Sequence, residues 1–127
     1  MEGKILVVDD ERAIRRLLEK AFINAGYTVY CARNGEEALE ISKRENIQVM
    51  FLDLKLPKMS GVDLCEQIRK DKPIALIYAM TAYTSLFELA DCREVGFDDY
   101  FIKPVEMKLL LKAAEDAFEK LDRWKKR

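Results

Sequence analysis

Five side chains able to do chemistry each stand directly after a short apolar run of the sequence. They are three carboxylates, one hydroxyl and one ammonium: Asp9, Asp10, Asp53, Thr81 and Lys103. Two carboxylates about 4 Å apart repel each other by about 4 kcal/mol at an effective dielectric constant near 20, so a group of them must bind a cation or take up a proton. All-oxygen ligands with room for water and phosphate are typical of Mg²⁺.

The same residues predict a phosphoryl-transfer site. Asp53 stands centrally among them, and a carboxylate can accept a phosphoryl group as an acyl phosphate. A bound metal ion and Lys103 would then neutralise the phosphoryl oxygens, and Thr81 would offer a hydroxyl. Each residue also has a purely structural explanation, because Asp10 or Thr81 would suit a helix cap and Lys103 an exposed surface.

The apolar runs predict parallel strands that are buried on both faces. They lack the alternation of apolar and polar residues that is typical of a strand with one face exposed to solvent. Helical patterns separate the runs, which implies right-handed crossovers and a doubly wound α/β domain with helices on both faces of a five-stranded parallel sheet. In such sheets the ligand site lies beyond the carboxyl ends of the strands, where the five polar residues fall. The predicted strands are 5–8, 29–32, 49–52, 74–80 and 100–102.

Stop and start signals place the helices between these strands. The first helix has its apolar face from Ile14 to Ala25 and stops at Gly26. The second begins near Asn34 and the third near Ser60, both of which are good amino-terminal caps. The fourth ends at Gly96, and the last runs over about 106–124.

Composition limits the function classes. The 127 residues suit one domain, 1–127, and a net charge of −1 provides no basic surface to hold nucleic acid or an anionic membrane. The amino-terminal residues resemble neither a signal peptide nor a membrane span, so we expect a cytoplasmic protein. Three widely spaced cysteines favour reduced core thiols. Histidine is absent, which excludes histidine-dependent catalytic triads and histidine-ligated metals.

The motifs together resemble the receiver domain of bacterial two-component response regulators over essentially the whole chain. They read ILVVDDE, NGEEALE, VMFLDLKLPKMSG, MTAY and DDYFIKPV, in the family's order and spacing. The resemblance implies the flavodoxin-like strand order 2-1-3-4-5 and a cis bond between Lys103 and Pro104. It also implies the site roles: Asp53 as phosphoacceptor, Asp9 and Asp10 as the acidic pair at Mg²⁺ with the backbone carbonyl of Lys55, Thr81 and Tyr100 as switch residues, and Lys103 as the phosphate-binding lysine.

The resemblance implies that the chain is a signalling protein and not an enzyme. A sensor histidine kinase would donate the phosphoryl group, which a histidine phosphotransferase or an output protein would then receive or sense. Phosphorylation would favour a conformation in which the side chains of Thr81 and Tyr100 point inward, and this change would alter the surface that binds a partner. Self-phosphorylation and self-dephosphorylation would be the only reactions.

Two variable positions predict a long-lived phosphoryl group. Lys55, two residues after Asp53, and Tyr83, two residues after Thr81, should flank the approach of water, and the pair resembles the sporulation-type phosphorelay intermediate. The alternative is that both side chains point into solvent.

The sequence is also compatible with three other interpretations. A phosphatase of the haloacid dehalogenase type also uses an aspartate nucleophile and Mg²⁺, but it needs an acidic residue where Lys55 stands. A receiver that docks without phosphorylation would lack Asp53 or Lys103, and both are present. The chain would also fit the amino-terminal receiver of a longer transcriptional regulator, although we favour the stand-alone form.

Overall fold

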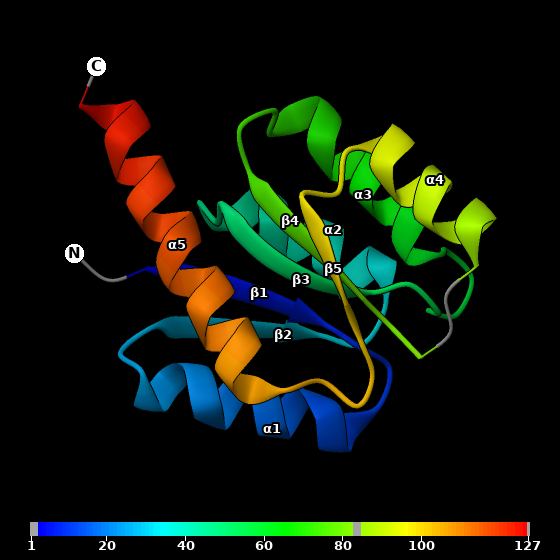
Figure 1. The fold of residues 1–127 in the computed structure, drawn as a ribbon, viewed down its shortest axis with the longest axis horizontal. Coiled ribbons are helices and arrows are strands. Elements are labelled where there is room, and N and C mark those ends of the chain that lie inside the picture. Colours follow the sequence, from blue (N-terminus) through cyan, green and yellow to red (C-terminus); the bar gives the residue numbers. More distant parts are fainter. Residues whose placement is uncertain (1–2, 83–84, 127) are drawn as a thin grey trace.

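The computed structural model describes residues 3–82 and 85–126, in which five parallel strands form one sheet with helices on both faces (Figure 1). The strand order is β2-β1-β3-β4-β5, which confirms the predicted order and fold class. In chain order the elements are β1 (Lys4–Val8), α1 (Arg12–Asn24), β2 (Thr28–Ala32), α2 (Gly35–Arg44), β3 (Val49–Asp53), α3 (Gly61–Asp71), β4 (Leu76–Thr81), α4 (Leu86–Val95), β5 (Asp99–Ile102) and α5 (Met107–Lys125).

Two apolar cores lie on opposite faces of the sheet. Successive side chains of a strand point to opposite faces. Ile5 and Val7 of β1 therefore belong to the core that α1 and α5 cover, whereas Leu6 and Val8 belong to the core on the side of α2, α3 and α4. All four side chains are fully buried. The central strands read as unbroken apolar runs because helices cover both of their faces (Figure 1).

The prediction that every strand is buried on both faces is wrong for β5, and it holds only in part for β2, in which four of five residues are half-buried. Tyr100 is 39% exposed and Ile102 is 54% exposed. β5 forms one edge of the sheet and β2 forms the other, so each has a strand neighbour on one side only. The apolar residues of β5 therefore contribute to the surface as well as to the core.

β4 begins two residues later than the apolar run predicts. The amide of Ala75 donates to the carbonyl of Lys72, which closes a turn before the strand. Ile74 lies in this turn and is 59% exposed. The sheet ladder starts at Leu76, whose amide donates to the carbonyl of Gln48.

The helix signals largely agree with the observed ends. The side chain of Asn34 accepts a hydrogen bond from the amide of Glu37 and caps α2, and Ser60 caps α3 in the same way. The cap positions of α1 and α4 are Glu11 and Ser85, so the alternative in which Asp10 and Thr81 serve as helix caps is wrong. Within the described part of the chain, no helix has the length and apolar composition needed to span a bilayer.

The three cysteines are free thiols, as predicted. Cys65 and Cys92 are buried and Cys31 is half-buried. Burial raises the pKa of Cys65 to about 12 and that of Cys31 to about 11. Because the thiolate is the reactive form, these thiols are poor nucleophiles at neutral pH.

Candidate functional site

The sheet brings the predicted site residues together at the carboxyl ends of its strands, where the hydrogen-bond ladder continues one residue past β1 and β5. The amide of Asp9 donates to the carbonyl of Ala32 at 3.1 Å, and the amide of Lys103 donates to the carbonyl of Thr81 at 2.8 Å. Asp53 is the last residue of β3 and Thr81 the last residue of β4. The strand ends therefore fix the backbone positions of these residues on a rigid support.

Three carboxylates meet at these strand ends. Oxygen atoms of Asp9, Asp10 and Asp53 all lie within 4.8 Å of one another. Asp9 is 0% exposed and Asp53 is 5% exposed, whereas Asp10 is exposed. Buried carboxylates are rare unless they are paired, because removal from water penalises the charged form.

Lys103 supplies the positive charge inside the cluster. Its Nζ donates to Oδ2 of Asp9 at 2.8 Å and lies 3.4 Å from Oδ2 of Asp53. The peptide bond from Lys103 to Pro104 is cis, as the family resemblance implies. Burial lowers the pKa of Lys103, but its bonds to Asp9 and the charges of Asp53 and Asp9 together outweigh burial and raise it. The side chain therefore remains an ammonium at neutral pH.

Asp53 is the carboxyl group of this cluster whose pKa is clearly raised, and burial is the main cause. Burial first, and then the charge of Asp9, raise the pKa of Asp53 from 3.8 to about 6. The amide of Lys55, which donates to Oδ1 of Asp53 at 3.2 Å, and the charge of Lys103 counteract this only in part. Ionisation of Asp53 therefore lowers the free energy of unfolding. A bound cation or another group that neutralises the charge would reverse this loss of stability.

Two further residues, not among those predicted from the sequence, hold Asp9 in place. The amide of Glu11 donates to Oδ1 of Asp9 at 2.9 Å, and a guanidinium nitrogen of Arg15 donates to the carbonyl of Asp9 at 2.8 Å. The Glu11 carboxylate lies 3.9 Å from Nζ of Lys103. Glu11 directly follows the acidic pair, which is a usable signal, whereas Arg15 occupies an ordinary position on a helix face.

Gly61, the last residue of the motif VMFLDLKLPKMSG, has a structural role that the sequence did not reveal. Its amide donates to the carbonyl of Leu54 at 2.9 Å, so the first turn of α3 lies directly against the backbone that follows Asp53. A Cβ atom on Gly61 would overlap the carbonyl oxygen of Asp53 and lie 2.7 Å from Cα of Leu54. The site requires glycine here because two stretches of backbone approach closely.

The two predicted switch residues differ in environment. Thr81 is 2% exposed, and its hydroxyl donates to Oε1 of Glu88 in α4 at 3.1 Å. The side chain of Tyr100 is partly exposed on the edge strand β5. Tyr83, predicted to tune dephosphorylation together with Lys55, lies outside the described residues. The Lys55 side chain is exposed.

The donor set at the strand ends fits Mg²⁺. The carboxylates of Asp9, Asp10 and Asp53 offer only oxygen, and the exposure of Asp10 leaves access from solvent. Such a site, open on one side and rich in carboxylates, suits a hard ion that keeps several waters. Burial and the neighbouring charge of Asp9 both raise the pKa of Asp53, and a bound cation would relieve both effects.

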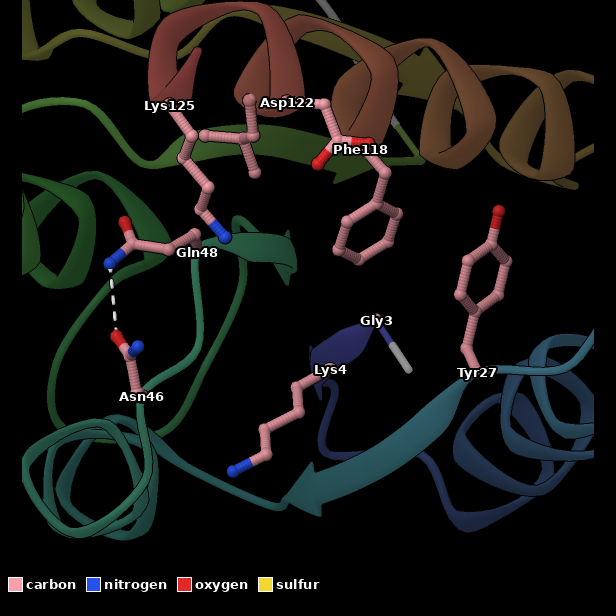
Figure 2. A pocket seen from close by; sticks show the side chains of 9 residues that line it. Gly3, Lys4, Tyr27, Asn46, Gln48, Phe118, Asp122 and Lys125 are labelled. Atoms are coloured by element: carbon pink, nitrogen blue, oxygen red, sulfur yellow. Dashed lines mark hydrogen bonds between the residues drawn. The ribbon is translucent and has the colours of Figure 1, made fainter. Parts of the chain in front are cut away.

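A separate pocket of about 390 Å³ lies at the opposite end of β1 and β3 (Figure 2). Lys4, Gln48 and Lys125 line it, together with the ring of Phe118. Figure 2 shows Asn46 and Gln48 bonded to each other at its rim, and that bond is 3.1 Å long. Because the pocket is at the amino ends of the strands, it has no part in the chemistry of the carboxylates.

Known sequences resemble this chain along most of its length. It is 39% identical over 120 residues to the "Probable transcriptional regulator ycf27" of Porphyridium aerugineum, covering 94% of this chain and 50% of the relative. It is 41% identical over 104 residues to the "Alkaline phosphatase synthesis transcriptional regulatory protein PhoP" of Bacillus subtilis, covering 82% and 43%. The chain thus spans about half the length of the curated relatives it matches.

Solved structures agree with the sequence comparison. A CheY-like response regulator receiver domain protein of Methanospirillum hungatei superposes with a TM-score of 0.90 at 32% identity, covering 99% of this chain and 98% of that one. The chemotaxis protein CheY4 of Vibrio cholerae superposes with a TM-score of 0.88 at 28% identity, covering 92% and 99%. Residues 5–115 match the family described as the response regulator receiver domain. The chain therefore belongs to the response regulator receiver domain family.

Proposed function

We propose that this receiver domain accepts a phosphoryl group on Asp53 from the phosphohistidine of a partner histidine kinase. The observation that carries the proposal is the position of Asp53, buried at a strand end between Asp9 and Lys103. Both of its carboxylate oxygens are oriented, Oδ1 by the amide of Lys55 and Oδ2 by Lys103. A fixed orientation is what an in-line attack on phosphorus needs.

In the proposed transfer, a carboxylate oxygen of Asp53 forms a bond to phosphorus while the bond from phosphorus to the leaving imidazole nitrogen breaks. The imidazole keeps the electron pair of that bond and later takes a proton from solvent. Lys103 stabilises the negative charge on the phosphoryl oxygens through its ammonium group. Loss of the phosphoryl group reverses the outcome, because water attacks phosphorus and releases phosphate from Asp53.

A divalent cation completes this site. Mg²⁺, when held by Asp9, Asp10, Asp53 and the backbone carbonyl of Lys55, supplies positive charge that neutralises the phosphoryl oxygens. Support comes from the all-oxygen donor set and from the raised pKa of Asp53. Glu11 and Arg15 act here as positioning residues, because both bond to Asp9.

The wider assignment follows from the family. We infer that residues 1–127 act as one receiver domain in the cytoplasm, that its partners are a sensor histidine kinase and a phosphotransferase or output protein, and that the domain itself does not contact nucleic acid. The relatives whose names describe transcriptional regulators are about twice as long as the matched region. An output of that kind would therefore belong to a longer protein.

Intact mass spectrometry tests the central assignment. The wild type is incubated with a small-molecule donor such as acetyl phosphate, with Mg²⁺ or with a chelator, beside Asp53→Asn. We expect one phosphoryl group to add only to the wild type and only with Mg²⁺. Addition to Asp53→Asn at the wild-type rate would refute Asp53 as the acceptor.

The time course after removal of the donor tests the predicted persistence of the label. Lys55 is exposed and lies two residues from the acceptor. We propose that its long cationic side chain obstructs the approach of water to the phosphoryl group. We expect slow loss of the label from the wild type. Loss within seconds would remove the argument from Lys55 and Tyr83.

A further inference from the structure

We propose that Glu88 is a positioning residue that competes with the phosphoryl group for the hydroxyl of Thr81. The proposal rests on the proposed function and extends it to α4. The Thr81 hydroxyl donates to Oε1 of Glu88 at 3.1 Å, across the segment that joins β4 to α4. Glu88 thereby acts on the phosphorylation site through Thr81 and without touching Asp53 itself.

The direction of the hydrogen bond is what creates the competition. An ionised carboxylate only accepts hydrogen bonds, so the hydroxyl of Thr81 must supply the proton. A hydroxyl has a single proton to donate. While that proton is directed to Glu88, the hydroxyl has none to donate to a phosphoryl oxygen on Asp53.

The surroundings fix Glu88 for this role. Its backbone amide donates to the side chain of Ser85, which caps α4, so Glu88 stands in the first turn of the helix. Thr81 is anchored from the other side, because its carbonyl accepts from the amide of Lys103. The hydroxyl therefore lies between a strand end and a capped helix, and a change of partner alters the contact between them.

This contact lies beside an exposed apolar surface. Leu86 and Phe87 stand between the cap Ser85 and Glu88, and they are 83% and 85% exposed. Release of Glu88 from Thr81 removes a bond that holds this turn to the sheet. The competition thus connects the occupancy of Asp53 to the amino end of α4.

Beryllofluoride, a non-covalent mimic of a phosphoryl group on aspartate, provides the test. Its dissociation constant in the presence of Mg²⁺ is measured by calorimetry for the wild type, Glu88→Ala and Glu88→Gln. Loss of one charge-assisted hydrogen bond at the low end of its usual strength corresponds to about a tenfold change. We expect Glu88→Ala to bind about tenfold more tightly, and Glu88→Gln, which keeps an acceptor oxygen, to bind about threefold more tightly.

Two controls separate this role from a general effect of charge. Asp91→Asn removes an exposed carboxylate from the same helix, and we expect it to change binding less than about twofold. In a Thr81→Val background, which lacks the hydroxyl, we expect Glu88→Ala to have no further effect. Equal tightening by Glu88→Ala and Glu88→Gln that persists in the Thr81→Val background would overturn the proposal in favour of simple repulsion.

A second readout uses the protein without metal or mimic. Because of the bond between Thr81 and Glu88, we expect the losses in free energy of unfolding caused by Thr81→Val and Glu88→Ala to be non-additive in urea unfolding. The double variant should be no less stable than the less stable of the two single variants. Additive losses would overturn the proposal. If the wild type binds beryllofluoride only with Asp53 intact but Glu88→Ala changes nothing, the inference fails alone, whereas absence of wild-type binding overturns it together with the proposed function.

Discussion

Replacement of Asp53 by Asn should stabilise the protein in the absence of a divalent cation. The structure raises the pKa of Asp53 from 3.8 to about 6, with burial as the main cause and the charge of Asp9 second. The folded state thus binds a proton more tightly than the unfolded state does. Stability from this group is fully present below pH 3.8 and is lost as the pH rises through about 6. Asn is neutral at every pH and escapes that loss.

The size of the effect follows from the pKa change. A shift of about two pH units corresponds to about 3 kcal/mol in the free energy of unfolding at pH 7.5, and to about 1 kcal/mol at pH 4.5. For a chain of 127 residues, an unfolding entropy of about 2.1 cal/mol/K per residue converts 3 kcal/mol into a rise of about 10 °C in Tm. Asn keeps an acceptor oxygen for the amide of Lys55, so this hydrogen bond survives the substitution.

Urea unfolding in the presence of a chelator at pH 7.5 and pH 4.5 is the appropriate assay. Asp91→Asn serves as the matched control, because it removes an exposed carboxylate and should change stability by less than about 0.5 kcal/mol. Added Mg²⁺ should stabilise the wild type more than Asp53→Asn and so reduce the difference. Equal stability of the two proteins at pH 7.5, or a gain of the same size at both pH values, would refute the reasoning.

Three other substitutions test the remaining contacts. Lys103→Gln leaves the buried Asp9 without its cation, so we expect the free energy of unfolding in urea to fall by about 3 kcal/mol and to be partly restored by Mg²⁺. An unchanged midpoint would contradict the pairing. Gly61→Ala places a Cβ against the backbone of Asp53, so we expect the free energy of unfolding to fall by about 2 kcal/mol and phosphorylation by acetyl phosphate to be slower. Wild-type stability and wild-type phosphorylation would show that the two backbone segments are not in tight contact. Lys55→Asn should shorten the lifetime of the phosphorylated protein severalfold in intact-mass time courses, and an unchanged lifetime would leave the Lys55 side chain without a role.

Most of the fold was predictable because the relevant signals are local. Apolar runs that lack alternation indicated strands covered on both faces, and Asn34 and Ser60 marked helix starts through their ability to cap. The prediction of burial for β5 failed because the edge position of a strand depends on the order of strands in the sheet. Apolar content alone does not distinguish an edge strand with exposed residues from a central one.

The candidate site was predictable where one rule applied, namely that functional residues follow parallel strands. This rule placed Asp9, Asp53, Thr81 and Lys103 together, and their backbone positions follow from the ladder. The residues that support them escaped detection. Arg15 acts through a side chain that reaches back over the strand end, and Glu88 acts across an intervening segment, so neither contact has a signature in local spacing.

The most direct test of the account is chemical trapping of the acyl phosphate. The phosphorylated protein is reduced with borohydride, which converts an aspartyl phosphate to homoserine, and the peptides are sequenced by mass spectrometry. We predict homoserine at position 53 alone, dependent on Mg²⁺ during phosphorylation. Reduction at Asp9 or Asp10 in place of Asp53, or no reduction in a protein that carries the added phosphoryl mass, would contradict it.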